Sequence, residues 1–226
     1  MNKTVLITGG NKGIGLELTR EFLALKYKVI VVARDFKGFI FAHEVACIAY
    51  DLTQVEGIPK LVASLGKIDI LINNAGAMYS LPYDNYPTDK VSSMLRLNLE
   101  TPIKLIEECV KAGTARVVNN ASVAAYTGHP DIWYGMTKAA LINATKSFSK
   151  IYEGKVILNA VAPSPIDTDM QKVNTEARKE AFKQAVITKR FGYASEVAKT
   201  ILWLATESPE YINGTTIDLN NGSYPR

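Results

Sequence analysis

Short runs of β-branched and aliphatic residues alternate with helical patterns along almost the whole chain. This alternation constrains the fold more than any other feature. The runs lie at residues 5–7, 29–32, 68–72, 116–118, 156–158 and 216–219. Continuous apolar runs of this length indicate strands that are buried on both faces of a sheet. An apolar stripe at helical spacing lies between the first two, at Ile14, Leu18, Phe22 and Leu25. The chain therefore begins with a predicted strand, helix and parallel strand.

Repetition of this unit to the C-terminus predicts the α/β fold class. We expect a doubly wound, mostly parallel sheet of about seven strands, with helices on both faces and right-handed crossovers. The 226 residues fit a single domain spanning residues 1–226, because no linker or low-complexity tract divides them. The stretch 34–51 is too short for a full helix and a third strand, so a shortened crossover is expected there.

The composition bears on which molecules the protein binds and on the compartment in which it works. The formal net charge is only +4, and no block of like charges occurs, so nucleic acid is not expected as a partner. No segment is long and apolar enough to span a membrane, and the N-terminus lacks the apolar stretch of a signal peptide. Cys47 and Cys109 lie among apolar residues and are expected to be buried free thiols in a reducing compartment. A cytoplasmic protein is therefore predicted.

A glycine-rich loop at residues 8–15 directly follows the first strand and opens the first helix. Its glycines at 9, 13 and 15 permit a sharp turn and a close approach of the backbone to a ligand. The free N–H groups and dipole at the start of a helix attract a pyrophosphate. A plain glycine turn between a strand and a helix would show the same pattern.

The motifs that follow this loop match one family in order. They are Asn73-Asn74-Ala75-Gly76 after the fourth strand, Ser122 after the fifth, Tyr134 and Lys138 on a helix, and residues 163–168. With the glycine spacing, they resemble the short-chain dehydrogenase/reductase family over nearly the whole chain, in particular its NADP-preferring carbonyl reductases and 3-oxoacyl-acyl-carrier-protein reductases. The resemblance implies an oxidoreductase that moves a hydride between NADP(H) and a small carbonyl or alcohol substrate.

The resemblance also implies the residues that bind the cofactor. They are Gly9, Asn11, Lys12, Gly13, Ile14, Gly15, Arg34, Asp51, Leu52, Asn74, Ala75, Gly76, Tyr134, Lys138, Pro163, Ile166 and Thr168. At the end of the second strand, Arg34 together with Lys12 favours NADP(H), because a guanidinium can bind a 2′-phosphate bidentately. NAD(H) would be favoured if Asp35 faced the ribose instead. Asp51 could equally cap a turn.

Ser122, Tyr134 and Lys138 are the predicted catalytic residues, with Asn98. Tyr134 and Lys138 are four residues apart, so their side chains share a helix face, although such pairs are common on solvated helices. Hydride delivery to a carbonyl carbon leaves charge on oxygen, which Tyr134 would protonate. Lys138 would lower the phenol's pKa from ~10 by up to about three units. Ser122 would hydrogen-bond the substrate oxygen.

Several further features leave alternatives open. By resemblance, Asn98 keeps a water beside the lysine, but it could instead be a buried amide at a helix kink. Ser164 replaces a glycine of the family, so either the turn is ordinary here or the loop differs. His43 and His129 are assigned surface or structural roles, and no metal site is expected. Tyr126 and Trp133 could line a pocket or serve in packing.

The resemblance finally implies a mobile substrate lid at Met170 and residues 171–183. It also implies a homodimer or homotetramer that associates through the helices beginning near Thr88 and Tyr134. A protein that binds NADP as a sensor or scaffold without turnover is the alternative function, because a dinucleotide fold does not by itself make an enzyme.

Overall fold

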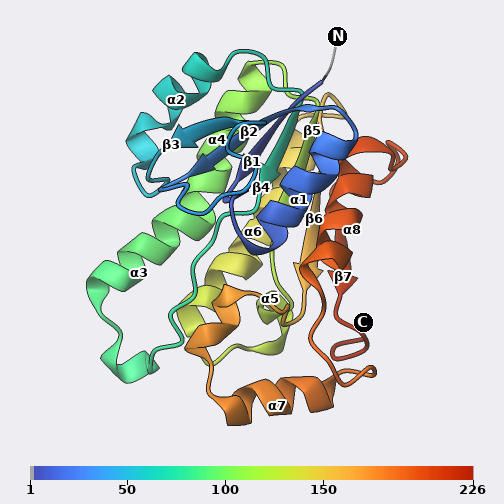
Figure 1. Cartoon of the computed structure of the whole chain (residues 1–226). Coiled ribbons are helices and arrows are strands. Elements are labelled where there is room, and N and C mark those ends of the chain that lie inside the picture. The colour runs from blue at the N-terminus through green and yellow to red at the C-terminus, as the bar shows by residue number, and fades with distance from the viewer. Residues whose placement is uncertain (1–2, 226) are drawn as a thin grey trace.

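The computed structural model describes residues 3–225 and contains one sheet of seven parallel strands (Figure 1). In chain order the strands are β1 Thr4–Thr8, β2 Lys28–Ala33, β3 Ala46–Ala49, β4 Ile70–Asn73, β5 Arg116–Asn120, β6 Ile157–Pro163 and β7 Thr216–Leu219. Their spatial order is β3-β2-β1-β4-β5-β6-β7. The strand order therefore reverses between β1 and β4, which confirms the predicted doubly wound fold.

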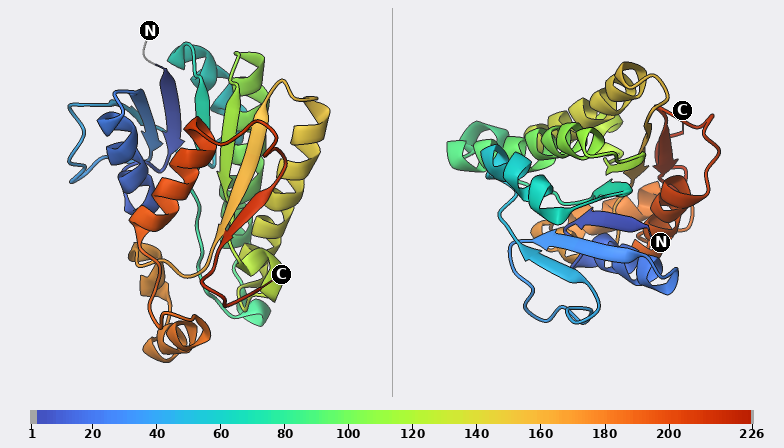
Figure 2. Two further views of the ribbon diagram at one scale, coloured as in Figure 1. Left: turned by 90° about the vertical axis from the view of Figure 1, so that its right-hand side faces the viewer. Right: turned by 90° about the horizontal axis from the view of Figure 1, so that it is seen from above.

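Helices cover both faces of this sheet, as the two views in Figure 2 show. They are α1 Gly13–Ala24, α2 Ile58–Leu65, α3 Thr88–Leu95, α4 Thr101–Lys111, α5 Ala124–Thr127, α6 Ile132–Ile151, α7 Glu176–Ala185 and α8 Ala194–Thr206. Short 3-10 turns lie at Val55–Gly57, Tyr83–Asn85 and Asp169–Val173, and a π turn lies at Arg96–Glu100. Helices α1 and α8 pack on one face, while α2 and α4 pack on the other.

Alternation of side chains along the strands divides the core into two layers. In β1, Val5 and Ile7 belong to the layer that contains Phe22 of α1. The residue between them, Leu6, belongs to the opposite layer with Leu105 of α4. All five side chains are fully buried, and burial of each stabilises the fold by about 1.5–3 kcal/mol. The two-sided burial expected from the continuous apolar runs is therefore confirmed for the central strands.

The sheet edges differ from the centre. Strand β7 is only half-buried and Cys47 in β3 is also half-buried, because each strand has a neighbour on one side alone. The predictions that residues 216–219 and Cys47 are fully buried were therefore wrong, whereas Cys109 in α4 is buried and both thiols are free. Strands β2 and β3 are joined without a helix, as the short sequence between them predicted.

Two features are absent from residues 3–225. No helix within that range combines the length and apolar character that crossing a bilayer requires. The same residues contain no cluster of three or more His, Cys, Asp or Glu side chains suited to a metal ion.

Candidate active site

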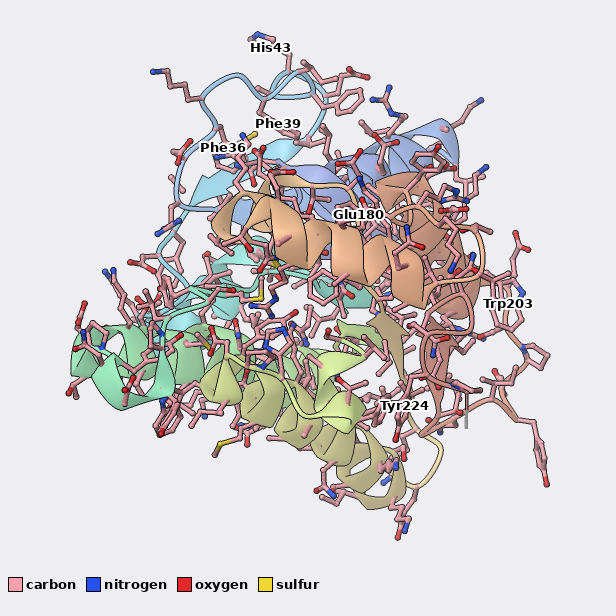
Figure 3. The ribbon with its side chains drawn as sticks, turned by 90° about the horizontal axis from the view of Figure 1, so that it is seen from below. Phe36, Phe39, His43, Glu180, Trp203 and Tyr224 are labelled. Carbon is pink, nitrogen blue, oxygen red and sulfur yellow. The ribbon has the colours of Figure 1, made fainter. Side chains whose placement is uncertain are left out.

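A cavity of about 740 Å³ opens at the carboxyl ends of the strands, where the reversal of strand order leaves a crevice. The loops after β1, β2, β3, β4, β5 and β6 line it, together with residues of α6 and α7. Figure 3 looks onto this edge of the molecule, and α7, which carries the labelled Glu180, lies across it. A volume of this size is typical of ligand pockets.

The glycine loop forms one wall of the cavity. Gly9 and Gly13 have φ angles of +66° and +51°, which L side chains rarely adopt. A Cβ on Gly15 would lie 2.0 Å from the carbonyl oxygen of Gly9, so this glycine allows α1 to pack beneath the loop. Gly15 does not line the cavity. Gly15 therefore packs against the loop backbone, whereas Gly9 and Gly13 line the wall, and contact of Gly15 with a cofactor stays a prediction.

Asn74 fixes the glycine loop to the centre of the sheet. Its Nδ2 donates to the carbonyl oxygens of Thr8 and Gly9 at 3.1 and 3.3 Å. Its Oδ1 accepts from Asn120 Nδ2 at 3.0 Å. The Thr8 hydroxyl in turn accepts from the N–H groups of Asn74 and Ala75 at 2.9 and 3.0 Å. These bonds join β1, β4 and β5 at the point where their carboxyl ends meet.

The residues present fit a dinucleotide. No acidic residue occupies the first turn of α1, so the positive end of its dipole is available to a phosphate. Further along the cavity, a Cβ on Gly76 would lie 3.3 Å from Asn98 Oδ1 and 3.5 Å from Lys138 Nζ. The absence of side chains on the glycine loop and on Gly76 therefore keeps an elongated space open from the helix start to Lys138.

The residues that were predicted to discriminate NADP(H) from NAD(H) lie at the rim of the cavity, beyond the ends of β1 and β2. Arg34 and Lys12 are exposed at its rim, and Asp35 also lines it. The Asp35 carboxylate accepts from the Lys37 N–H at 3.2 Å, and its carbonyl oxygen accepts from Asn11 Nδ2 at 2.9 Å. Asp35 is therefore held within its own loop.

Asp51 caps a turn at the cavity wall, which is one of the two roles that the sequence left open, and its contact with a cofactor stays a prediction. It lines the cavity beside Leu52, and its Oδ1 also accepts from the N–H and the hydroxyl of Thr53 at 3.0 and 2.9 Å. The Thr53 N–H holds the pKa of this carboxyl below its usual value, and the charge of Arg34 adds a smaller effect in the same direction. A negative charge thus remains in place near Arg34.

Three of the four predicted catalytic side chains meet in the cavity. Ser122, Tyr134 and Lys138 are all buried and line it. Lys138 Nζ donates to the Asn120 carbonyl oxygen at 2.8 Å and lies 5.7 Å from the centre of the Tyr134 ring. Helix α6 presents Tyr134 and Lys138 on one face, as their spacing predicted.

Burial shifts the pKa values of this pair in opposite directions. It raises the pKa of the Tyr134 phenol, and the charge of Asp131 adds to the increase, while a hydrogen bond with Ser122 opposes it. Burial also lowers the pKa of Lys138 to about 8. Desolvation of the phenolate is the largest cause of the raised Tyr134 pKa, and a lowering of that pKa by Lys138 stays a prediction.

Asn98 lies behind the cavity wall. It is buried in the π turn Arg96–Glu100, and its amide exchanges two hydrogen bonds with the Ala77 backbone at 2.8 and 2.9 Å. Its Nδ2 also contacts the Thr137 hydroxyl at 3.2 Å. Asn98 does not line the cavity. The structure thus favours the alternative of a buried amide at a helix distortion, which holds the strand-end segment that contains Gly76.

The loop after β6 has an ordinary backbone. Ser164 does not adopt a positive φ, and its N–H donates to the Leu219 carbonyl oxygen at 2.9 Å. Its replacement of a glycine therefore creates no strain. The remaining predicted cofactor residues all line the cavity, at Asn11, Ile14, Ala75, Gly76, Pro163, Ile166 and Thr168.

The cavity lining also includes Asn174 and Phe182, which lie within the segment predicted to be the substrate lid. Sequence reasoning missed three further lining residues, Tyr79, Lys90 and His129. The His129 ring lies 5.3 Å from that of Tyr134, and its Nε2 lies 2.9 Å from Arg178 Nη2 of α7. His129 was assigned a surface or structural role, and its position only five residues before Tyr134 was the one available signal.

Tyr126 and Trp133 serve in packing. Tyr126 stacks on Tyr224 with ring centres 5.9 Å apart, and Trp133 packs against Tyr134 and Met94. Neither side chain lines the cavity.

Comparison with known proteins identifies the family. The sequence model of the short chain dehydrogenase family matches residues 3–179, a range that includes the glycine loop, Ser122, Tyr134 and Lys138. The chain belongs to this family. The match confirms the resemblance and places the protein among dehydrogenases and reductases.

Individual relatives of this short-chain dehydrogenase span its whole length. A 3-oxoacyl-acyl-carrier-protein reductase from Aquifex aeolicus is 31% identical over 241 residues, which cover 98% of this chain and 97% of the relative. A solved glucose/ribitol-type short-chain dehydrogenase from Brucella melitensis has 28% identity and a TM-score of 0.92, covering 100% of this chain and 98% of that one. The structure of ElxO with NADP bound has 28% identity and a TM-score of 0.86 over 99% of both chains.

Proposed function

We propose that this short-chain dehydrogenase transfers a hydride between NADP(H) and a carbonyl or secondary alcohol substrate, with Tyr134 as the general acid and base. The observation that carries the proposal is the meeting of Ser122, Tyr134 and Lys138 in the cavity that the glycine loop also lines. The nicotinamide of a bound cofactor would supply or accept the hydride. The protein side chains would position the substrate oxygen and move its proton.

Each of the three side chains has a role that follows from its position. The Ser122 hydroxyl would hydrogen-bond the substrate oxygen and fix its orientation. The raised pKa of Tyr134 keeps the phenol protonated at neutral pH, so it can donate a proton as charge develops on that oxygen. Lys138, protonated below its pKa of about 8, would stabilise the developing negative charge in a site where water is scarce.

The proposal of NADP(H) over NAD(H) rests on the far end of the cavity. Arg34 and Lys12 place two positive charges at the rim. The carboxylate of Asp35 accepts a hydrogen bond from its own loop. A 2′-phosphate would therefore meet two cations and could bind bidentately to Arg34. The relative ElxO, which was solved with NADP, supports the same choice.

The relatives suggest the first substrates to try. The Aquifex aeolicus relative is a 3-oxoacyl-acyl-carrier-protein reductase, so 3-oxoacyl thioesters are the leading candidates for this chain. Ketones without a thioester and sugar alcohols form the second group. We also propose that the enzyme works in a reducing cytoplasm, which its two free thiols fit.

Self-association is part of the proposal. Ile132, Met136 and Ile151 expose apolar surface on α6, the helix that carries Tyr134. A second copy that covered this surface would remove it from water, which supports a homodimer or homotetramer. Measurement of the mass in solution would test this, and a monomer at micromolar concentration would contradict it.

Replacement of Tyr134 by phenylalanine tests the catalytic role. Tyr134→Phe removes the proton donor but keeps the ring, so we expect carbonyl reduction to slow by about 10²–10⁴-fold. The affinity for NADPH, measured by fluorescence titration, should stay within about threefold of the wild type. Retained turnover would contradict the assignment. Tight binding of NADPH by the wild type without turnover of any carbonyl substrate would instead support a sensor or scaffold.

A further inference from the structure

Asp131 is a buried carboxylate three residues before Tyr134, and hydride transfer as described above does not require it. Only 1% of its surface is exposed. Its Oδ1 accepts from the Tyr134 N–H at 3.1 Å and caps α6. Its Oδ2 accepts from the N–H groups of Ser80 and Tyr79 at 2.9 and 3.3 Å and from the Tyr86 hydroxyl at 2.9 Å. The two oxygens therefore bind two different parts of the chain.

The segment held by Oδ2 adjoins the cavity, which it lines through Tyr79. It spans residues 79–86, contains only one short 3-10 turn, and includes Ser80 at a φ of +52°. Two adjacent N–H groups that converge on one carboxylate oxygen stabilise such a turn. The segment presents Tyr79 to the cavity, and the Tyr79 hydroxyl contacts Ser93 Oγ at 3.3 Å. Asp131 thereby fixes the position of this segment relative to Tyr134.

Helix α7 is linked to the backbone of Asp131 through the ring of His129. Arg178 Nη2 of α7 lies 2.9 Å from His129 Nε2. On the other side of the ring, His129 Nδ1 lies 3.1 Å from the Asp131 nitrogen and 3.2 Å from the Asp131 carbonyl oxygen. The Asp131 side chain thus bonds the catalytic helix and the 79–86 segment, while the Asp131 backbone contacts α7 only through His129.

We infer that Asp131 is a positioning residue, which holds the 79–86 segment against the first turn of α6 and places a carboxylate beside Tyr134. The inference rests on the proposed role of Tyr134. It concerns the position and the protonation of the Tyr134 side chain, rather than the hydride transfer.

The electrostatic part follows from the groups around Tyr134. Burial is the largest cause of the raised pKa of Tyr134, and the Asp131 carboxylate increases it further. The other charged or titratable groups nearby are Lys138 on the same helix, His129 in the preceding loop and Arg178 behind it. Tyr79 and Tyr86 also pack against the Tyr134 cluster. Substitution of Asp131 leaves all five in the chain, so a change in the Tyr134 titration would report the loss of the carboxylate charge.

The test is the variant Asp131→Asn, which keeps the size of the side chain and removes its charge. NMR of protein labelled with ¹³C in its tyrosine rings gives the titration of Tyr134, whose signal is assigned by its loss in Tyr134→Phe. We expect the midpoint to fall by at least ~0.5 pH unit. We also expect the Tyr79 and Ser80 amides to exchange with deuterium at least about tenfold faster. Neither measurement requires a substrate.

Asp69→Asn is the matched control. Asp69 also accepts a backbone N–H, from Thr4 at 2.8 Å, but it lies beside the amino end of β4, away from the cavity. This control should change neither the Tyr134 midpoint nor exchange at residues 79–80. An Asp131→Asn midpoint within about 0.2 unit of the wild type, or unchanged amide exchange, would overturn the inference.

Tyr86→Phe keeps the inference testable if Asp131→Asn does not fold. It removes one donor to Oδ2 and leaves the charge, so exchange at residues 79–86 should accelerate at least about threefold while the Tyr134 midpoint stays unchanged. Unchanged exchange would overturn the inference. Failure of the proposed function is distinguishable, because it would show as retained turnover in Tyr134→Phe and would leave these NMR and exchange results unaffected.

Discussion

Lys138 carries a charge at a buried position, and this has a cost for stability. Its pKa of about 8 lies below the usual 10.5 because burial disfavours the ammonium. Between these two values the unfolded chain binds more protons at this lysine than the folded protein does. The contribution of Lys138 to stability therefore rises as the pH increases from about 8 to 10.5, and below pH 8 it is unfavourable.

Lys138→Met should consequently stabilise the protein at pH 7 while it impairs catalysis. Removal of the buried charge, offset by loss of the hydrogen bond to Asn120, should add about 2 kcal/mol and raise Tm by about 5 °C. Calorimetry should show this gain at pH 7 and its disappearance near pH 10.5. Lys146→Met, at an exposed position of the same helix, is the control. A lower Tm for Lys138→Met at pH 7 would contradict the account.

Arg34 is the residue that should discriminate between cofactors. In Arg34→Asp a carboxylate replaces the guanidinium at the rim of the cavity, so the Kd for NADPH should rise by about 10- to 100-fold. The Kd for NADH should change by less than about threefold, because NADH lacks the 2′-phosphate. Fluorescence titration with both cofactors gives the ratio, and an unchanged ratio would show that another residue binds the phosphate.

At the scale of elements, the contact between the glycine loop and α1 depends on Gly15. A Cβ there would lie 2.0 Å from a backbone oxygen, and backbone cannot move aside as a flexible side chain can. Gly15→Ala should therefore displace the loop and weaken NADPH binding by at least about tenfold. Gly38→Ala controls for backbone strain without steric overlap, because Gly38 has a φ of +72° but a Cβ there would meet nothing within 4 Å. Equal NADPH affinity in the Gly15→Ala and wild-type proteins would contradict this role.

The central elements could be predicted because local patterns carry their signal. Apolar runs located β1, β2, β4, β5 and β6, and the stripe from Ile14 to Phe22 located α1. The half-burial of β7 could not be predicted in this way, since it depends on which strand ends at the sheet edge. The alternation of Val5, Leu6 and Ile7 between two layers follows directly from the two-residue period of a strand.

At the scale of the whole molecule, the cavity exists because strand order reverses between β1 and β4. Motif order was enough to predict that the glycine loop, Ser122, Tyr134 and Lys138 meet there. The roles of His129 and Asp131 were not predictable, because each depends on a partner distant in sequence, such as Arg178 or Tyr79. Gly15 and Asn98 lie outside the cavity lining, and this could not be predicted either, since the position of a residue in a motif does not reveal whether its side chain faces the cavity.

Hydride transfer with NADP(H) is tested by following NADPH and NADH absorbance in parallel against a panel of carbonyl compounds. The panel should contain 3-oxoacyl thioesters, diketones, quinones and sugars. We expect substrate-dependent oxidation of NADPH, with kcat/KM at least about tenfold higher than with NADH. Tight binding of NADPH with no oxidation by any compound, or a preference for NADH, would contradict the proposed function.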